Sequence, residues 1–191
     1  MSRFVTFIAW SVLVIIVIIF SGCLNNEARI REIAKEEAKK MFEEYKQSYK
    51  PEKFEFGISW EKDYSFSQAT RVGNMIFLAG QFSHDTEIDK NGLPLRDFQT
   101  GKSFEVQLRQ TLENMKKVLA KHGATMDDVV FLQHFVDTEA GRNKAGNYLP
   151  VLSKLIKEYF PKGLQGMTCV EVEDLFGEEQ LIESNAIAVV H

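Results

Sequence analysis

The sequence predicts an α+β domain in which one mixed sheet is backed by two helices on one face. Two segments in the second half of the chain carry apolar residues at helical spacing. The segments around them are short, apolar and rich in β-branched residues, as strands are. The resulting order, β-β-α-β-α-β-β, is typical of such an α+β arrangement. At 191 residues, 45% of them hydrophobic, the chain suffices for one domain and an N-terminal extension.

Residues 1–22 are interpreted as a signal peptide or a membrane anchor. Residues 4–20 are almost free of polar groups, and as a helix they would span roughly 25 Å, which is short for a membrane span. Two small residues precede Cys23, an arrangement that resembles a lipobox and makes Cys23 the expected lipidation site. An uncleaved N-terminal helix is the alternative. In either case we expect a membrane-anchored protein whose domain is extracytoplasmic.

Residues 23–50 are expected to form a helical stalk. The segment is charged, and Pro51 should end it. Its apolar residues recur every three or four positions, at Ile30, Ala34, Ala38, Met41 and Tyr45. Two interpretations stay open, a solvated stalk and a short three-stranded coiled coil above a trimer.

The domain, residues 51–191, should begin with strands at 64–70 and 75–81 around a Val-Gly-Asn turn. Residues 84–98 are predicted to be loop. An amphipathic helix is predicted over 102–122, with Gly123 as its stop. Its buried face should contain Phe104, Leu108, Thr111, Met115, Val118 and Leu119.

The C-terminal half should continue with an apolar strand over 129–136 and a second helix over 143–160. That helix is expected to bury Tyr148, Leu152, Leu155, Ile156 and Tyr159. Residues 166–190 then look like a hairpin, with strands at 167–172 and 181–190 joined by a turn-like segment.

Several spaced motifs in this domain resemble one family. They are Phe66-Ser67-Gln68-Ala69, the run from Val72 to Gln81, Asn114, Gly123, Asp128-Val129-Val130, Phe135-Val136-Asp137, Tyr148 and the C-terminal hairpin. With them the chain resembles, from about residue 58 onward, the Rid family of reactive intermediate deaminase or YjgF-like proteins. The resemblance implies a chorismate-mutase-like fold with a mixed six-stranded sheet, a homotrimer with clefts between subunits, and no metal or organic cofactor. For the deaminase branch it implies hydrolysis of 2-imino or enamino acids, such as 2-iminobutanoate and 2-iminopropanoate, to 2-keto acids and ammonia.

Four positions depart from the deaminase pattern. Met167 stands where deaminase members carry an arginine that binds the substrate carboxylate. Asn185 corresponds to the glutamate that would orient or activate the attacking water, and an amide cannot accept that proton at neutral pH. Phe66 replaces a tyrosine, and Ala79 replaces a serine. Turnover of ordinary 2-imino acids is therefore expected to be lost or altered.

The resemblance also predicts which residues line the cleft, although the catalytic residues stay unknown. The lining consists of Phe66, Ala79, Gly80, Gln81, Met167, Thr168, Cys169 and Asn185. Lys162, in a long loop, and Glu183, on the strand face of Asn185, are the candidates to compensate for the missing groups. Cys169 is expected to be a small buried residue rather than a reactive thiol. The four histidines are scattered, so no metal site is expected.

Three functions remain open. The first is a membrane-tethered homotrimer whose apolar cleft binds a small uncharged or aromatic ligand without hydrolysing it. The second is an imine or enamine deaminase of altered specificity, and the third is an envelope holdase or assembly protein. With a net charge of -4 and no basic run interleaved with aromatics, no nucleic-acid partner is expected.

Overall fold

The computed structural model describes residues 27–95, 102–138 and 147–190. The predicted N-terminal anchor and Cys23 lie outside these residues. The chain divides into two compact units, one ending at Lys50 and the other comprising Pro51–Val190. Among the described residues, no helix has both the length and the apolar character needed to cross a membrane.

The first unit contributes one described helix, α2, which spans Glu27–Ser48. It ends shortly before Pro51, because a proline disfavours helical geometry in the residue before it. Several of its apolar side chains are exposed, including Ile33, Phe42 and Tyr45.

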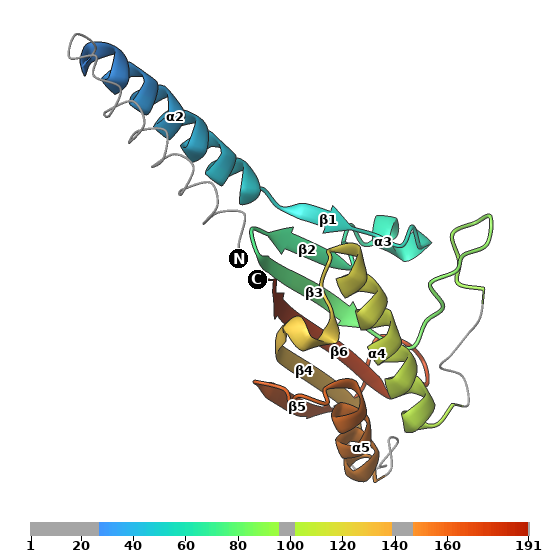
Figure 1. The fold of residues 1–191 in the computed structure, drawn as a ribbon. Helices are drawn as coiled ribbons and strands as arrows, with labels where there is room; N and C mark the ends of the chain where they lie inside the picture. The colour runs from blue at the N-terminus through green and yellow to red at the C-terminus, as the bar shows by residue number, and fades with distance from the viewer. Residues whose placement is uncertain (1–26, 96–101, 139–146, 191) are drawn as a thin grey trace. The chain divides into compact units, whose positions relative to one another are not determined.

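The second unit contains the predicted mixed six-stranded sheet, which is confirmed (Figure 1). Its strands are β1 (Glu52–Phe54), β2 (Ala69–Val72), β3 (Met75–Gln81), β4 (Val129–Asp137), β5 (Met167–Val172) and β6 (Ile182–Val189). They lie in the order β1-β2-β3-β6-β4-β5. Only the pairing of β4 with β5 is parallel.

The predicted C-terminal hairpin is wrong, because β4 lies between β5 and β6. Gln133 on β4 is opposite Asn185 of β6 on one side and opposite Thr168 of β5 on the other. Strand β6 alternates between buried and half-buried residues, which suits the centre of a sheet, whereas most residues of β5 are exposed, which suits an edge. The central position also gives β6 a hydrogen-bonding partner along both of its edges.

Two further differences concern the start of the domain. The helix α3 (Ser59–Asp63) and the three-residue strand β1 are too short for a periodic pattern to predict. The predicted strand over 64–70 begins only at Ala69, because the chain is still turning at the end of α3: the backbone N–H groups of Tyr64 and Phe66 donate to the carbonyls of Trp60 and Glu61, and Ser65 has a φ of 56°. The carboxylate of Glu61 binds the chain on the other side of α3. It accepts backbone N–H groups from Phe56, Gly57 and Ile58 at 2.9, 2.7 and 2.9 Å. Three such charge-assisted bonds hold the chain before α3 in a compact turn.

Two long helices cover one face of the sheet, as predicted (Figure 1). Helix α4 spans Phe104–Lys121, and its N-cap Ser103 accepts the backbone N–H of Val106. Gly123, at φ 73°, supplies the left-handed residue that ends it. Helix α5 spans Leu149–Tyr159, so it begins later than the predicted residue 143, with Pro150 in its first turn. Residues 139–146 lie outside the described residues.

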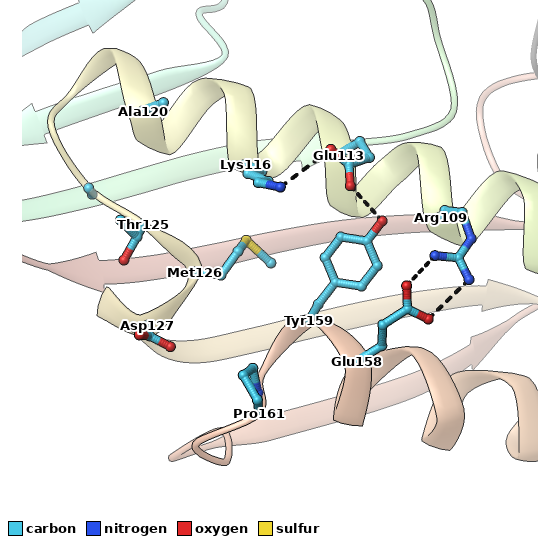
Figure 2. A pocket seen from close by; sticks show the side chains of 11 residues that line it. Arg109, Glu113, Lys116, Ala120, Thr125, Met126, Asp127, Glu158, Tyr159 and Pro161 are labelled. Atoms are coloured by element: carbon cyan, nitrogen blue, oxygen red, sulfur yellow. Dashed lines mark hydrogen bonds and ion pairs between the residues drawn. The ribbon is translucent and has the colours of Figure 1, made fainter.

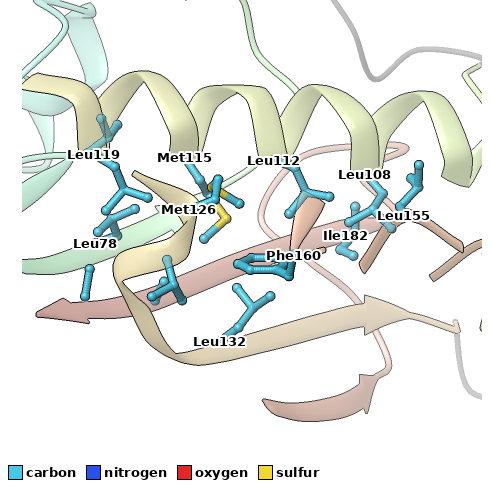
Figure 3. Packing of buried hydrophobic residues seen from close by; sticks show 14 of the residues in the cluster. Leu78, Leu108, Leu112, Met115, Leu119, Met126, Leu132, Leu155, Phe160 and Ile182 are labelled. Carbon is cyan, nitrogen blue, oxygen red and sulfur yellow. The ribbon is translucent and has the colours of Figure 1, made fainter. Parts of the chain in front are cut away.

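The hydrophobic core lies between these helices and the sheet (Figure 3). Its fully buried side chains include Leu108, Leu112, Met115 and Leu119 of α4, Leu155 of α5, and Ile76, Leu132 and Ile182 of the sheet. Each contributes about 1.5–3 kcal/mol by leaving water, so the helix faces that the periodicity predicts are also the faces that hold the fold together.

The other face of the sheet is not covered by α4 or α5, and we call it the open face. Along β6, Ile182, Ser184, Ala186 and Ala188 are buried under the helices, while the residues between them point to the open face. By strand register the open face includes Met75, Phe77, Phe131, Gln133, Phe135, Thr168, Val170, Glu183, Asn185, Ile187 and Val189. Phe77 is 41% exposed there, and Met75 and Val170 are 37% exposed. The open face is therefore an apolar surface with a few polar groups in it.

Candidate functional site

A half-buried carboxylate lies on the open face, where Glu183 packs against Gly80. A Cβ atom added to Gly80 would be 1.8 Å from Oε1 of Glu183 and 2.7 Å from its Cδ, so only a glycine leaves room for the carboxylate. The Nε2 group of Gln180 donates to Oε2 of Glu183 at 3.1 Å. Burial raises the pKa of Glu183, because desolvation disfavours the charged form, and the bond from Gln180 offsets this only in part. A carboxyl group with a raised pKa is suited to accept and return a proton.

Three polar side chains form a row across the open face next to Glu183. Asn185 on β6 is opposite Gln133 on β4, which is opposite Thr168 on β5. Side chains at directly opposite positions have Cβ atoms roughly 5 Å apart, so the three can share hydrogen bonds with one ligand or water. Phe131 and Phe135 flank Gln133 on the same face of β4. The row is thus a polar strip between aromatic side chains.

Gln133 is absent from the residues mapped by family resemblance, although it links two of them. The sequence feature that could have identified Gln133 is its polar side chain in the middle of the mainly apolar strand 129–136. The next residue, His134, is also polar but points the other way. It is buried, and its Nδ1 lies 2.7 Å from Oγ of Ser184. Burial lowers the pKa of His134 to about 4, so it is neutral at physiological pH and serves the core.

Met167 and Cys169 lie on the same strand as Thr168 but face the opposite side. Cys169 is opposite the buried His134, which places it and its neighbours two residues away on the helix-covered side of the sheet edge. Met167 is 46% exposed at the start of β5. Burial raises the pKa of the Cys169 thiol, which disfavours the thiolate.

Gln81 also lies away from the open face. It is fully buried and opposite Ser184, because an irregularity in β3 between Leu78 and Gln81 shifts the register. Its Nε2 donates to Oε1 of Gln68 at 2.7 Å, and Nε2 of Gln68 donates to Oε1 of Glu61 at 2.7 Å. A carboxylate only accepts, so Glu61 fixes the orientation of both amides in turn. Gln81 thereby belongs to a buried hydrogen-bonded chain that ties β3 to α3.

Phe66 and Ala79 are each bonded through their backbone to a member of this hydrogen-bonded chain. Both are half-buried, and Phe66 lies in the connection between α3 and β2. The backbone N–H of Ala79 donates to the carbonyl of Gln68 at 2.9 Å, and that of Phe66 to the carbonyl of Glu61 at 3.0 Å. They therefore lie near Gly80 at the same end of the sheet, whereas Met167 and Thr168 are on the edge strand β5.

Lys162 forms an ion pair with Asp127. Its ammonium lies 2.5 Å from Oδ2 of Asp127, in the turn before β4, and this ion pair raises its pKa. The pair is exposed, so it holds Lys162 only weakly. In this structure Lys162 therefore serves a surface contact and not the polar row.

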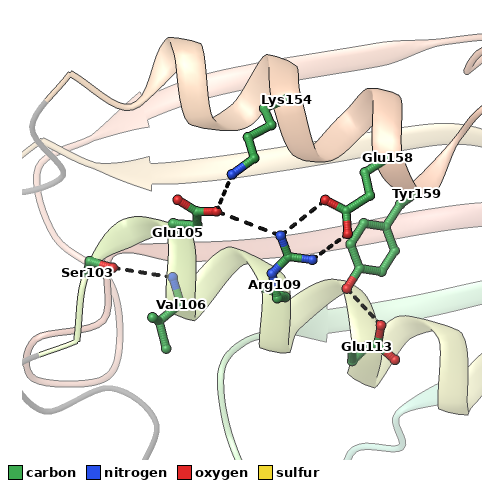
Figure 4. A network of polar contacts seen from close by, with 8 residues as sticks. All are labelled: Ser103, Glu105, Val106, Arg109, Glu113, Lys154, Glu158 and Tyr159. Atoms are coloured by element: carbon green, nitrogen blue, oxygen red, sulfur yellow. Dashed lines mark hydrogen bonds and ion pairs between the residues drawn. The ribbon is translucent and has the colours of Figure 1, made fainter.

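A groove of about 630 Å³ lies elsewhere, beside α4 and the end of α5 (Figure 2). Four of its polar side chains are paired with one another across the two helices (Figure 4). Arg109 makes two bonds to the carboxylate of Glu158, at 2.5 and 3.1 Å, and the hydroxyl of Tyr159 donates to Glu113 at 2.7 Å. Burial and that bond raise the pKa of Tyr159 to about 12. The groove includes none of the predicted cleft residues, and its polar network joins α4 to α5.

The domain is similar to known proteins both in sequence and in fold. Residues 60–190 match the family model described as Endoribonuclease L-PSP. A RutC family protein from Pyrococcus abyssi is 32% identical over 123 residues, which cover 64% of this chain and 84% of that relative. A 2-iminobutanoate/2-iminopropanoate deaminase from Dermatophagoides farinae is 29% identical over 126 residues, covering 65% of this chain and 85% of that enzyme. The crystal structure of a YjgF-family member from Mycobacterium tuberculosis, 23% identical, has the same fold, with a TM-score of 0.58 over 74% of this chain and 100% of that one.

Proposed function

Because the chain belongs to the endoribonuclease L-PSP family, the Rid or YjgF-like family that its motifs resemble, we propose that it binds a small uncharged or aromatic ligand. We propose further that its hydrolysis of ordinary 2-imino acids is lost or altered. The observation that carries both statements is Met167, whose thioether offers no donor where a carboxylate would need a cation. Leaving a carboxylate unpaired in a half-buried cleft costs several kcal/mol, and about 1.4 kcal/mol is tenfold in rate, so turnover falls by orders of magnitude.

We propose that the site is completed by a second copy of the chain. In one copy the candidate residues lie at two places, with Phe66, Ala79 and Gly80 at one end of the sheet and Met167 and Thr168 on its edge strand. The exposed apolar residues of the open face support self-association, since such patches are usually covered by a partner. A homotrimer is the assembly that the family resemblance implies.

The membrane tether is likewise a proposal, and the N-terminal sequence supports it. An apolar segment followed by small residues and Cys23 fits a lipoprotein signal. Lipidation at Cys23 predicts that the mature protein incorporates labelled fatty acid and that Cys23→Ala does not. Retention of the Cys23→Ala variant in membranes, without label, would instead support an uncleaved helix.

We do not extend the nuclease activity in the family's name to this chain. The net charge is -4, and nucleic-acid affinity depends on cationic side chains that neutralise phosphates. No feature of the described residues favours the envelope holdase either.

The experiment that tests ligand preference compares benzamide with benzoate, which share size and shape but differ in charge. Equilibrium binding to the purified full chain should favour benzamide, and Met167→Arg should reverse the preference by supplying a bidentate partner for the carboxylate. Met167→Gln, polar but uncharged, is the matched control and should leave the preference as it is. Equal or tighter binding of benzoate by the wild type would refute the proposal, and so would binding of neither compound.

A second candidate function rests on Glu183. Its raised pKa and its place beside Asn185 on β6 suit a general base that activates water held by the polar row. The substrate would be an imine or enamine without a carboxylate, since a second negative charge beside Glu183 is unfavourable. Glu183→Gln should then abolish ammonia release from a neutral imine, while Gln180→Leu should shift its pH dependence. An unchanged rate in Glu183→Gln would rule this function out.

A further inference from the structure

Six apolar side chains form one continuous stripe along α2, and two further ones, Ile33 and Phe42, lie outside it on its two flanks. Ile30, Ala34, Ala38, Met41 and Tyr45 are followed by Tyr49, one residue past the helix end. Tyr45 and Tyr49 are 48% and 49% exposed, and their rings lie 4.8 Å apart at their centroids. A helix of 22 residues with an exposed apolar stripe gains little from propensity alone and is normally stabilised by packing that stripe against a partner.

The spacing of the stripe repeats after 11 residues. Ile30 and Met41, Ala34 and Tyr45, and Ala38 and Tyr49 are each one such repeat apart. An 11-residue repeat corresponds to about 3.67 residues per turn, close to the 3.6 of a straight helix, whereas a heptad repeat winds helices into a left-handed supercoil. The stripe therefore suits nearly straight helices packed side by side, with a slight right-handed twist.

The charges beside the stripe differ between its two flanks. At 3.6 residues per turn, one flank carries Arg31, Lys35, Lys39 and Lys46 and no acidic residue. The other flank carries Glu37 and Glu44, with Lys40 between them. Each copy of α2 thus presents a basic side and a mainly acidic side.

This asymmetry selects the direction of packing. When identical helices pack in parallel, the flank on one side of each stripe meets the opposite flank of its neighbour, so basic meets acidic. When they pack antiparallel, like flanks meet, which places lysines against lysines. Flanking charges of this kind set partner and orientation in helical assemblies. A lipid surface would use the stripe without any need for two flanks of opposite charge.

We propose that α2 is an oligomerisation helix that packs in parallel against α2 of other copies of this chain along the stripe. In a parallel assembly every copy of α2 runs in the same direction along the common axis, and a cyclic oligomer requires this. The inference is independent of any ligand or catalytic activity, because it rests on α2 alone.

Cysteine cross-linking of the full chain tests the proposal. Ala34→Cys places a thiol in the stripe and away from the middle of α2, so parallel copies bring two of these thiols together while antiparallel copies do not. Glu32→Cys, on the opposite side of the same turn, is the matched control. Under mild oxidation the disulfide between two thiols at position 34, identified by mass spectrometry, should form about tenfold faster than the one at position 32.

Three outcomes would overturn the proposal. Equal rates at positions 34 and 32 would mean that the domains alone hold the helices near one another. Absence of a cross-link at position 34 would mean that the stripe faces something other than a second copy, such as a lipid surface. If copies carrying Ala34→Cys are mixed with copies carrying Met41→Cys and the 34–41 disulfide predominates, packing is antiparallel.

Discussion

Acidification should destabilise this domain through one buried imidazole, that of His134. The ring is fully buried between the sheet and the helices, and Ser184 is its hydrogen-bonding partner. Burial lowers its pKa from 6.5 to about 4. In the unfolded chain the same ring takes up a proton near pH 6.5, so between these values the unfolded state binds more protons than the folded state.

The sign and the size of the effect follow from this difference. The contribution of neutral His134 is fully present above about pH 6.5 and is lost as the pH falls toward about 4, below which the dependence levels off. Each pKa unit corresponds to about 1.4 kcal/mol, so the free energy of unfolding should fall by roughly 3 kcal/mol across this range.

Urea unfolding at fixed protein concentration measures this loss, with wild type and His134→Gln compared at a series of pH values. Glutamine can still hydrogen-bond Ser184 but does not titrate. Other groups with displaced pKa values, such as His84 and Glu183, are present in both proteins and cancel in the difference. The two unfolding free energies should therefore converge as the pH falls. Parallel curves would refute the assignment of the acid sensitivity to His134.

Three further predictions concern single side chains. Gly80→Ala should push the carboxylate of Glu183 into solvent and return its pKa toward the ordinary value, which NMR titration of the Glu183 side chain measures; an unchanged pKa would contradict the close packing. Glu61→Gln leaves one acceptor oxygen for four donors, so it should lower the free energy of unfolding by about 3 kcal/mol. Urea unfolding measures this change, and a decrease of less than about 1 kcal/mol would count against the buried network. Cys169 should react with iodoacetamide at least several-fold more slowly in the folded protein than in urea, since burial raises its pKa; equal rates would show an accessible thiolate.

Local periodicity predicts most of the secondary structure of this chain. Helix α4 lies within the range 102–122, and all six residues of its predicted buried face are buried. The signal is strong because an amphipathic helix repeats its pattern over five turns. The short elements α3 and β1 carry no such repeat, and the carboxylate of Glu61 that organises them acts on neighbours whose sequence gives no sign of it.

Strand partners are harder to predict than strands. The segments 167–172 and 181–190 have the composition of strands, but nothing in either shows that β4 inserts between them. The row of Asn185, Gln133 and Thr168 exists only because of that insertion. The orientation of Gln81 could not be predicted either, because an irregularity in β3 turns its side chain to the buried side. The two-residue spacing of Glu183 and Asn185, in contrast, is enough to place both on one strand face.

The most direct test of the proposed function is ammonia release from 2-iminobutanoate generated in situ. We expect the wild-type chain to release ammonia at close to the uncatalysed rate, and the double variant Met167→Arg, Asn185→Glu to release it orders of magnitude faster, because it regains the carboxylate partner and the proton acceptor. Met167→Gln, Asn185→Gln is the matched uncharged control and should stay inactive. Rapid turnover by the wild type would contradict the account and assign the missing chemistry to Glu183, and an inactive double variant would show that the cleft is not the one that the family resemblance implies.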